Sequence, residues 1–142
     1  MASINQRINS LENKPKWSIY NNGTGVVNIA QNSVLSFNTT EFAHKVAVNL
    51  GSDRVIIQES GYYCVGYQLQ ITGIPPNVGG VLMIRNGGEH YMVSGDSGVS
   101  AENSTIIKYF NTGDYLQLFC FRGPIPVVQG IGRFNFWGFK IE

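Results

Sequence analysis

The sequence carries little charge. Only 13% of its 142 residues are charged, against roughly 25% in a typical soluble domain. Ten Lys and Arg residues against nine Asp and Glu residues leave a formal net charge of +1, with no run of basic side chains. Nucleic acids and anionic membranes bind basic patches, so we expect neither as a partner.

Long apolar runs are also missing. No stretch approaches the roughly 18 consecutive apolar residues of a membrane-spanning helix, so we expect no membrane insertion. The first residues, MASINQRINSLENK, lack the apolar core of a secretory signal peptide. A chain of 142 residues is expected to form one domain around a single core.

Cysteine is scarce, and acidic residues are scattered. Cys64 and Cys120 lie within apolar segments, which favours buried reduced thiols over the alternative of a disulfide. The two cysteines are too far apart in sequence for a zinc-knuckle spacing, and no paired acids or oxygen-rich metal loop occur. The sequence therefore predicts no metal and no cofactor.

One motif of an enzyme class occurs, at Gly95-Asp96-Ser97-Gly98. The same four residue types surround the nucleophile of chymotrypsin-like proteases, where the serine needs a histidine base and an orienting carboxylate. His44 and His90 are the only histidines, and 142 residues are too few for the two barrels of that fold. We interpret the motif as a polar hairpin loop and expect no catalytic residue.

The N-terminal segment predicts a short helical stem. Its apolar residues follow the four-then-three spacing of a coiled-coil seam, and isoleucine in such a seam favours three parallel strands. These seam residues are Ile4, Ile8 and Leu11. Pro15 ends the pattern. We expect a stem over residues 1–15 and a head domain over residues 16–142, the alternative being an amphipathic helix folded onto its own domain.

From Trp17 onward the pattern indicates β-strands separated by turns. Asn86-Gly87 predicts a tight hairpin, and residues 111–114 predict another turn. Many short strands at regular spacing are typical of a sandwich or jelly roll. The expected strands cover residues 16–20, 25–29, 33–37, 45–49, 54–58, 61–71, 80–86, 89–93, 104–110, 114–121 and 132–141.

The strand predicted over residues 61–71 is apolar on both sides near its start. Successive side chains of a strand point to opposite faces. One face carries Tyr63, Val65, Tyr67, Leu69 and Ile71. The opposite face begins with Tyr62, Cys64 and Gly66 before it turns polar at Gln68. A strand that is apolar on both faces must be covered on both, so we expect something to pack on Tyr62, Cys64 and Gly66.

Several segments, taken in order, resemble one family. Val55-x-Ile57-x-x-x-Gly61-Tyr62-Tyr63-Cys64-Val65-x-x-Gln68 is similar to the signature strand of the tumour necrosis factor superfamily and its complement q-subcomponent branch. The segments VLMIRNGG, STIIKYFNTGDYLQL and FNFWGFKI resemble later parts of that branch, so the similarity spans residues 33–141. Tyr62 and Cys64 depart from the cytokine pattern, which prefers other large hydrophobic residues at these positions.

The resemblance implies an all-β, ten-stranded jelly-roll sandwich that assembles as a homotrimer. On this basis Tyr62, Cys64 and Gly66 are expected to contact neighbouring subunits near a three-fold axis. A parallel stem built on Ile4, Ile8 and Leu11 has the same symmetry. The alternative is a monomer whose own loops cover this face.

Residues 123–130, GPIPVVQG, predict an apolar surface loop and a candidate ligand-binding site, the alternative being a loop that covers the core. The candidate binding residues are Ile125, Val127, Val128 and Gln129. With the Asn-rich stem, this pattern suggests a non-enzymatic virion or extracellular-surface module. We expect a phage fibre or decoration head that binds a host-surface glycan or protein, with its stem on other virion proteins. The alternative is a secreted or spore-surface ligand of a protein receptor.

Overall fold

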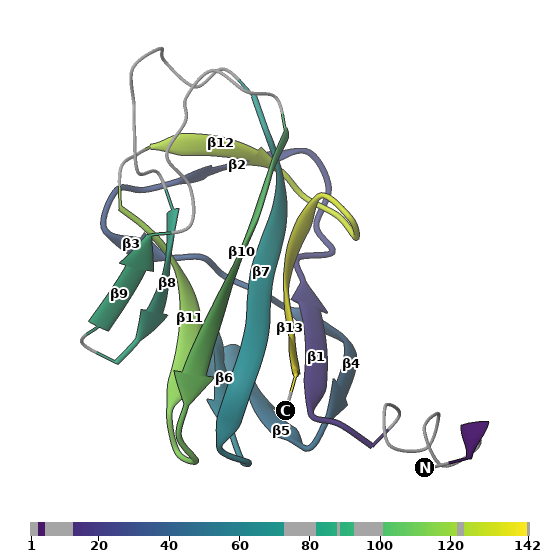
Figure 1. Ribbon diagram of the computed structural model, residues 1–142. Helices are drawn as coiled ribbons and strands as arrows, with labels where there is room; N and C mark the ends of the chain where they lie inside the picture. Colours follow the sequence, from purple (N-terminus) through teal and green to yellow (C-terminus); the bar gives the residue numbers. More distant parts are fainter. Residues whose placement is uncertain are drawn as a thin grey trace.

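The computed structural model describes residues 3–4, 13–72, 82–87, 89–92, 101–121 and 124–141. These residues form two antiparallel β-sheets that pack face to face (Figure 1). Sheet A contains β1 (Lys16–Tyr20), β2 (Val26–Ile29), β4 (Thr39–His44), β7 (Gly61–Ile71), β10 (Ala101–Phe110), β12 (Ile125–Val128) and β13 (Phe134–Lys140). Sheet B contains β3 (Ser33–Val34), β5 (Val46–Asn49), β6 (Arg54–Ile57), β8 (Leu82–Asn86), β9 (Glu89–Met92) and β11 (Tyr115–Cys120), and the 3-10 helix η1 (Leu50–Ser52) joins β5 to β6.

β7 is the centre of sheet A. β10 pairs with β7 along one side, while β13 and then β12 pair with its other side. β1 pairs with β13, and β4 pairs with β1. The middle of the sheet therefore runs β10-β7-β13-β1-β4, and this order determines which side chains become neighbours on its two faces.

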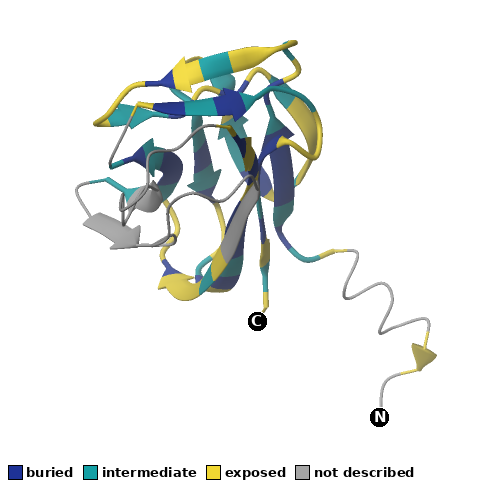
Figure 2. Ribbon diagram, turned by 90° about the horizontal axis from the view of Figure 1, so that it is seen from above, coloured by how far each residue is buried: buried dark blue, intermediate teal, exposed yellow. Residues whose placement is uncertain are grey.

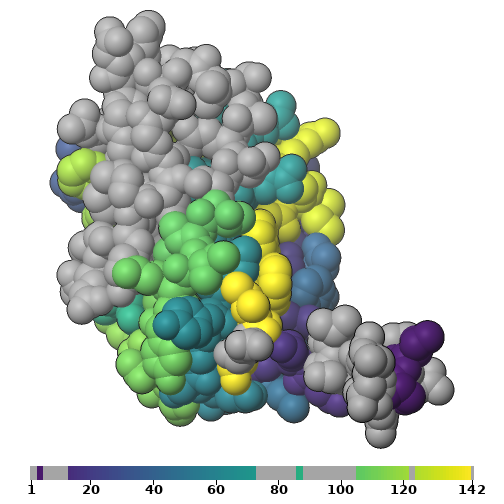
Figure 3. Space-filling view, viewed as in Figure 1, coloured from purple at the N-terminus to yellow at the C-terminus, as the bar shows by residue number. Residues whose placement is uncertain are grey.

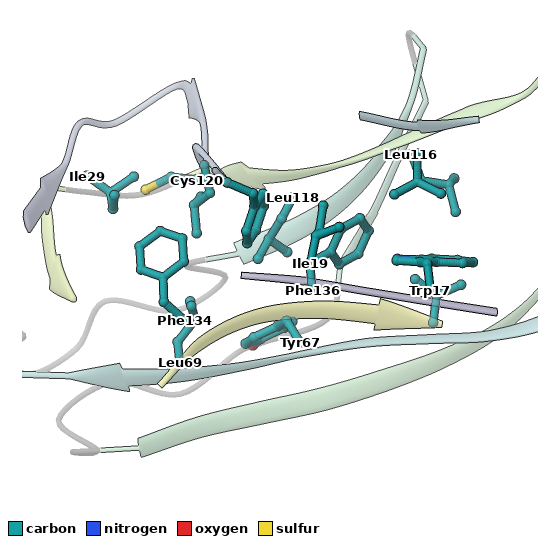
Figure 4. Packing of buried hydrophobic residues seen from close by; sticks show 14 of the residues in the cluster. Trp17, Ile19, Ile29, Tyr67, Leu69, Leu116, Leu118, Cys120, Phe134 and Phe136 are labelled. Atoms are coloured by element: carbon teal, nitrogen blue, oxygen red, sulfur yellow. The ribbon is translucent and has the colours of Figure 1, made fainter. Parts of the chain in front are cut away.

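The hydrophobic core lies between the inner faces of the two sheets (Figure 4). The predicted buried face of β7 is confirmed, because the side chains from Tyr63 to Ile71 at alternate positions are at most 1% exposed. Trp17 of β1 fills the space beside Gly138 of β13, where an added Cβ atom would overlap the indole ring. A glycine inside a strand often marks such a close approach. Figure 2 shows how residues that face the core and residues that face outward follow one another along the described strands, in buried and exposed colours.

The strand predictions are mostly confirmed, with four corrections. The expected ten strands are too few, because the described residues contain thirteen strand segments. The strand predicted over residues 33–37 is shorter in the structure, where only β3 is extended and paired. Leu35 and Phe37 lie beyond its end but are still buried. β4 was not predicted, since its sequence TTEFAH mixes polar and apolar residues without the alternation of a half-buried strand.

The fourth correction concerns residues 123–130, which were predicted to be a loop. Residues 125–128 form β12, which pairs with β2 along its length and with the end of β7. Ile125 and Val127 point into the core and are 1% and 0% exposed. The proline at position 126 made the segment resemble a loop, but a proline fits in a short strand where its missing N–H is not needed.

Candidate subunit interface

The outer face of sheet A is the apolar surface that the alternation of β7 predicts. Tyr62 is 55% exposed, Cys64 is half-buried, and Gly66 is buried by its neighbours although it has no side chain. Among the described residues, the Tyr109 ring packs against Tyr62 and still leaves about half of the Tyr62 side chain exposed. The two faces of β7 therefore differ: one is closed by sheet B, and the other is open in a single chain.

β10 extends this open surface. Its register places Ile107 beside Cys64 and Tyr109 beside Tyr62. Ile107 and Tyr109 are 64% and 50% exposed, and the Tyr62 and Tyr109 rings meet edge to face with 5.2 Å between centroids. We name Tyr62, Ile107 and Tyr109 the ridge. It consists of large exposed side chains from β10, the strand at this edge of sheet A, and from β7 beside it.

On the other side of β7 the same face is hollow. The register aligns Phe42 of β4, Ser18 of β1 and Trp137 of β13 in one row across three strands. Ser18 is small and lies between two aromatic side chains, so the aromatic rings form the two sides of a depression and Ser18 forms its bottom. Trp137 also stacks on Phe139, with ring planes 10° apart and centroids separated by 6.2 Å.

The hollow has a volume of about 520 Å³, and we name it the groove. Aromatic and apolar side chains make up about half of its lining residues, and polar or charged side chains, among them the buried Ser18 and Asn135, make up the rest. The lining residues are Lys14, Pro15, Lys16, Trp17, Ser18, Glu41, Phe42, Gln68, Ile131, Gly132, Asn135, Trp137, Gly138, Phe139 and Lys140. Figure 3 shows atoms of β10 (green), β7 (teal) and the end of β13 (yellow) adjoining on one side of the molecule.

Basic residues surround the lower rim of the groove. The Lys140 ammonium donates to the Glu59 carboxylate at 2.7 Å, and this hydrogen bond holds the pKa of Glu59 below its usual value. The Lys14 ammonium donates to the backbone carbonyl of Ile141 at 2.6 Å, which ties the segment before β1 to the end of β13. These two contacts hold the rim in place, and the groove lining carries one carboxylate, Glu41, together with three lysines.

The predicted interface residues are partly brought together. Tyr62, Cys64 and Gly66 share the outer face of sheet A, as the alternation of β7 requires. Ile4 is 75% exposed, while Ile8 and Leu11 lie outside the described residues, so the coiled-coil seam remains a prediction. The ridge residues of β10 and the aromatic residues of β4 and β13 were missed. For β10 and β13 the signal was apolar side chains on both faces of STIIKYF and FNFWGFK, whereas the TTEFAH segment of β4 carries no such signal.

The candidate ligand-binding residues are placed differently from the expectation. Ile125 and Val127 belong to the core, so their side chains offer no surface to a ligand. Val128 and Gln129 are half-buried, and the Gln129 amide donates to Asn21 Oδ1 at 3.1 Å. A binding role for these last two residues stays a prediction.

The cysteines and candidate catalytic residues can also be placed in part. Neither Cys64 nor Cys120 forms a disulfide, as predicted; Cys120 is buried as expected, whereas Cys64 is only half-buried. The Gly95–Gly98 motif lies outside the described residues. Over the part of the chain that the structure describes, no three His, Cys, Asp or Glu side chains gather as a metal-binding group. No helix in the same part is long and apolar enough to cross a membrane.

Comparison with solved structures identifies the architecture. The chain superimposes on Eiger TNF from S. frugiperda with a TM-score of 0.69 at 13% sequence identity, over 91% of this chain and 93% of that one. The fold is a tumour necrosis factor-like and complement q-like jelly roll. The resemblance inferred from the motifs is thereby confirmed at the level of the fold.

Two further structures support this tumour necrosis factor-like fold. The globular domain of zebrafish complement 1qA protein gives a TM-score of 0.66 at 14% identity, over 91% of this chain and 98% of that one. Murine APRIL gives a TM-score of 0.65 at 10% identity, over 90% and 99% of the two chains. No protein-family model and no curated protein matches the sequence. The similarity is therefore one of backbone architecture.

Proposed function

We propose that the chain is a non-enzymatic binding head that assembles as a homotrimer through the outer face of sheet A. The observation that carries this proposal is the continuous apolar surface formed by the ridge and the aromatic walls of the groove. Exposed apolar surface of this kind on a soluble domain usually marks a contact with another molecule. Interfaces that form permanently resemble a protein core cut in two, which fits a face rich in Phe, Tyr, Trp and Ile.

Two independent expectations give three as the number of subunits in the assembly. The tumour necrosis factor-like resemblance of the motifs implies a trimer, and the seam proposed for Ile4, Ile8 and Leu11 favours three parallel helices. A stem over residues 1–15 that continues the axis of a head over residues 16–142 needs matching symmetry in both parts. Tyr62, Cys64 and Gly66 then belong to the subunit interface.

We further propose that the assembled head acts at a virion or extracellular surface, with a host-surface glycan or protein as its partner. The stem then joins the head to other virion proteins. Three weak binding sites on one axis gain strength only against a target that offers several copies of the ligand. An intact host surface is therefore expected to retain the trimer much better than it retains an isolated subunit.

The test compares two arginine substitutions of exposed apolar residues. Ile107→Arg places a charge on the ridge, whereas Val26→Arg places one on β2, away from the ridge and the groove; the two positions are 64% and 55% exposed. At micromolar concentration we expect three chains in sedimentation for the wild type and for Val26→Arg, and single chains for Ile107→Arg. Intact host cells should retain the wild type and Val26→Arg and release Ile107→Arg. A wild-type protein that sediments as a single chain would exclude the proposed assembly.

A further inference from the structure

An uncharged part of the chain surrounds the end of β1. Residues 17–40 contain no Lys, Arg, His, Asp or Glu, but they include five asparagines. Gln129, in the turn between β12 and β13, joins this region through its side chain. Amide side chains donate and accept hydrogen bonds without carrying charge. A ligand that binds here would therefore meet polar but neutral groups.

Asn21 organises the region from inside and is only 9% exposed. Its Nδ2 donates to the backbone carbonyl of Ser36 at 3.2 Å. Its Oδ1 accepts from the backbone N–H of Gly23 at 2.9 Å and from the Gln129 amide at 3.1 Å. Both polar atoms of the Asn21 side chain thus have partners within the protein. Asn21 is therefore a positioning residue rather than a ligand contact.

The Gln129 amide is held in one orientation. A Cβ atom added at Gly23 would lie 2.6 to 2.8 Å from the Nε2, Cδ and Oε1 atoms of Gln129, so this amide packs directly on the glycine backbone. Its Nε2 is tied to Asn21, while none of the described residues donates to its Oε1. An acceptor that is fixed before a ligand arrives loses little conformational entropy on binding.

Asn38 is fixed on the other side of the same turn. Its Oδ1 accepts from the backbone N–H of Asn22 and from the Thr39 hydroxyl, both at 2.9 Å. The exposed Asn38 side chain therefore keeps its NH2 group as a donor for another molecule. The Asn22 side chain is exposed as well and bonds to none of the described residues. The turn thus presents one fixed acceptor, one fixed donor and one amide that offers both.

The segments that carry these amides lie side by side. The Gly130 N–H donates to the Asn21 carbonyl at 2.7 Å, and the Asn38 N–H donates to the Tyr20 carbonyl at 3.1 Å. Figure 1 shows the turn before β13 next to the end of β1. Hydrogen-bonded neighbouring segments are about 4.8 Å apart, so three of them span about 10 Å. This width suits one or two linked sugar rings.

We propose that Asn22, Asn38 and Gln129 form a binding site for a neutral saccharide. Sugar hydroxyl groups donate and accept, so they match the Gln129 Oε1 acceptor and the Asn38 NH2 donor. None of the three side chains lines the groove or belongs to the ridge, so a contact through the outer face of sheet A leaves the site uncovered. The inference rests on the proposed function and narrows its host-surface partner to an uncharged glycan.

Binding of the intact chain to a glycan array tests this site. The array presents neutral oligosaccharides of glucose, galactose and mannose beside counterparts that carry sialic or uronic acid. Asn22→Ala is the decisive variant, because the Asn22 side chain supports no contact with the described residues, and Gln129→Ala removes the fixed acceptor. Asn28→Ala is the matched control, since Asn28 is an exposed amide of the same uncharged stretch that lies on β2. Sedimentation and thermal unfolding of each protein accompany the array.

We expect the wild type and Asn28→Ala to bind neutral oligosaccharides. Asn22→Ala and Gln129→Ala should bind them at least about tenfold more weakly, because each lost hydrogen bond counts three times in the trimer. The melting temperature of Asn22→Ala should equal that of the wild type. Undiminished binding by Asn22→Ala, or an equal loss in Asn28→Ala, would overturn the site.

The remaining outcomes separate this site from the proposed function. Binding confined to the acidic oligosaccharides would show that the neutral class is wrong. A trimeric wild type that binds no oligosaccharide, yet is retained by intact host cells, has a protein as its partner, so the saccharide site is wrong while the proposed assembly stands. A wild type that sediments as a single chain contradicts the proposed function, whereas neutral-glycan binding that depends on Asn22 would still support this site.

Discussion

Two titratable side chains in the core, those of Cys120 and Tyr63, make the stability of the folded protein depend on pH. Burial raises the pKa of the Cys120 thiol from 9.0 to about 11. Burial, and secondarily the nearby Glu59 charge, raises the pKa of Tyr63 from 10.0 to about 12, while its hydroxyl donates to the Glu59 backbone carbonyl at 2.6 Å. In both cases the folded protein keeps a proton that the unfolded chain gives up at lower pH. Their stabilising effect is therefore complete below the unfolded pKa and decreases as pH rises through the folded one.

The first prediction is a loss of stability at alkaline pH that depends on Cys120. Between about pH 9 and pH 11 the free energy of unfolding should fall, with the Cys120 thiol contributing at most about 2 kcal/mol of that decrease. Urea unfolding at several pH values measures it. Cys120→Ala should lower stability at pH 8 but flatten its decline with pH, and Cys64→Ala, at a half-buried thiol, should flatten it less. Equal pH profiles for the two variants and the wild type would contradict this assignment.

At the scale of strands, the sequence predicted the structure most accurately where the alternation of apolar and polar residues extended over many positions. The alternation over residues 61–71 was enough to give both faces of β7 and to place Tyr62, Cys64 and Gly66 together. β12 was misread because its identity depends on pairing with β2 and β7, and four residues that include a proline hold too little local pattern.

The groove could not be predicted from the sequence for a related reason. It exists because Phe42, Ser18 and Trp137 come from three strands that are far apart in sequence and fall into one row. The register includes an irregularity between Ser18 and Ile19, which shifts β4 relative to β1. Small–large alternation within one strand is visible in a sequence, but a row across several strands requires the register of every pair.

The second prediction separates the two faces of β12. Val127→Ser should lower the free energy of unfolding by about 2 kcal/mol, because it removes buried methyl groups and places a hydroxyl in the core. Val128→Ser, at the half-buried neighbouring position, should change stability by less than about 1 kcal/mol. Thermal or urea unfolding of the two variants provides the comparison. Similar losses for both would mean that β12 does not present alternate faces to the core.

At the scale of the whole molecule, the two faces of sheet A make different contacts. The inner face of sheet A closes the core with residues such as Trp17 and Phe136, which lie 5.9 Å apart between ring centroids. Its outer face is left with exposed Ile107, Tyr109 and Phe42. Sheet A thus requires a second sheet on one side and, in our proposal, neighbouring copies on the other. Assembly and folding then use the same strands, so a change in β7 or β13 is expected to affect both.

The last prediction uses Cys64 as a reporter of this assembly. Cys64 is half-buried in a single chain, beside Ile107 of β10 and Phe139 of β13 in the sheet register, and burial raises its pKa. Under the proposed trimer its thiol lies inside the subunit contact, so alkylation at micromolar protein should be slow. Phe42→Arg disrupts the groove three strands away from Cys64, and it should increase the alkylation rate about tenfold or more, the factor that corresponds to about 1.4 kcal/mol.

Phe42→Arg is preferred to Ile107→Arg in this experiment, because an arginine next to Cys64 would change the reactivity of the thiol by its charge alone. Cys120 is the internal reference, since it is fully buried in each chain and should react only after unfolding. Dilution of the wild type should move its Cys64 rate toward that of Phe42→Arg. If Cys64 reacts equally fast in both proteins while Cys120 stays protected, the outer face of sheet A is open in solution and another surface must hold the subunits together.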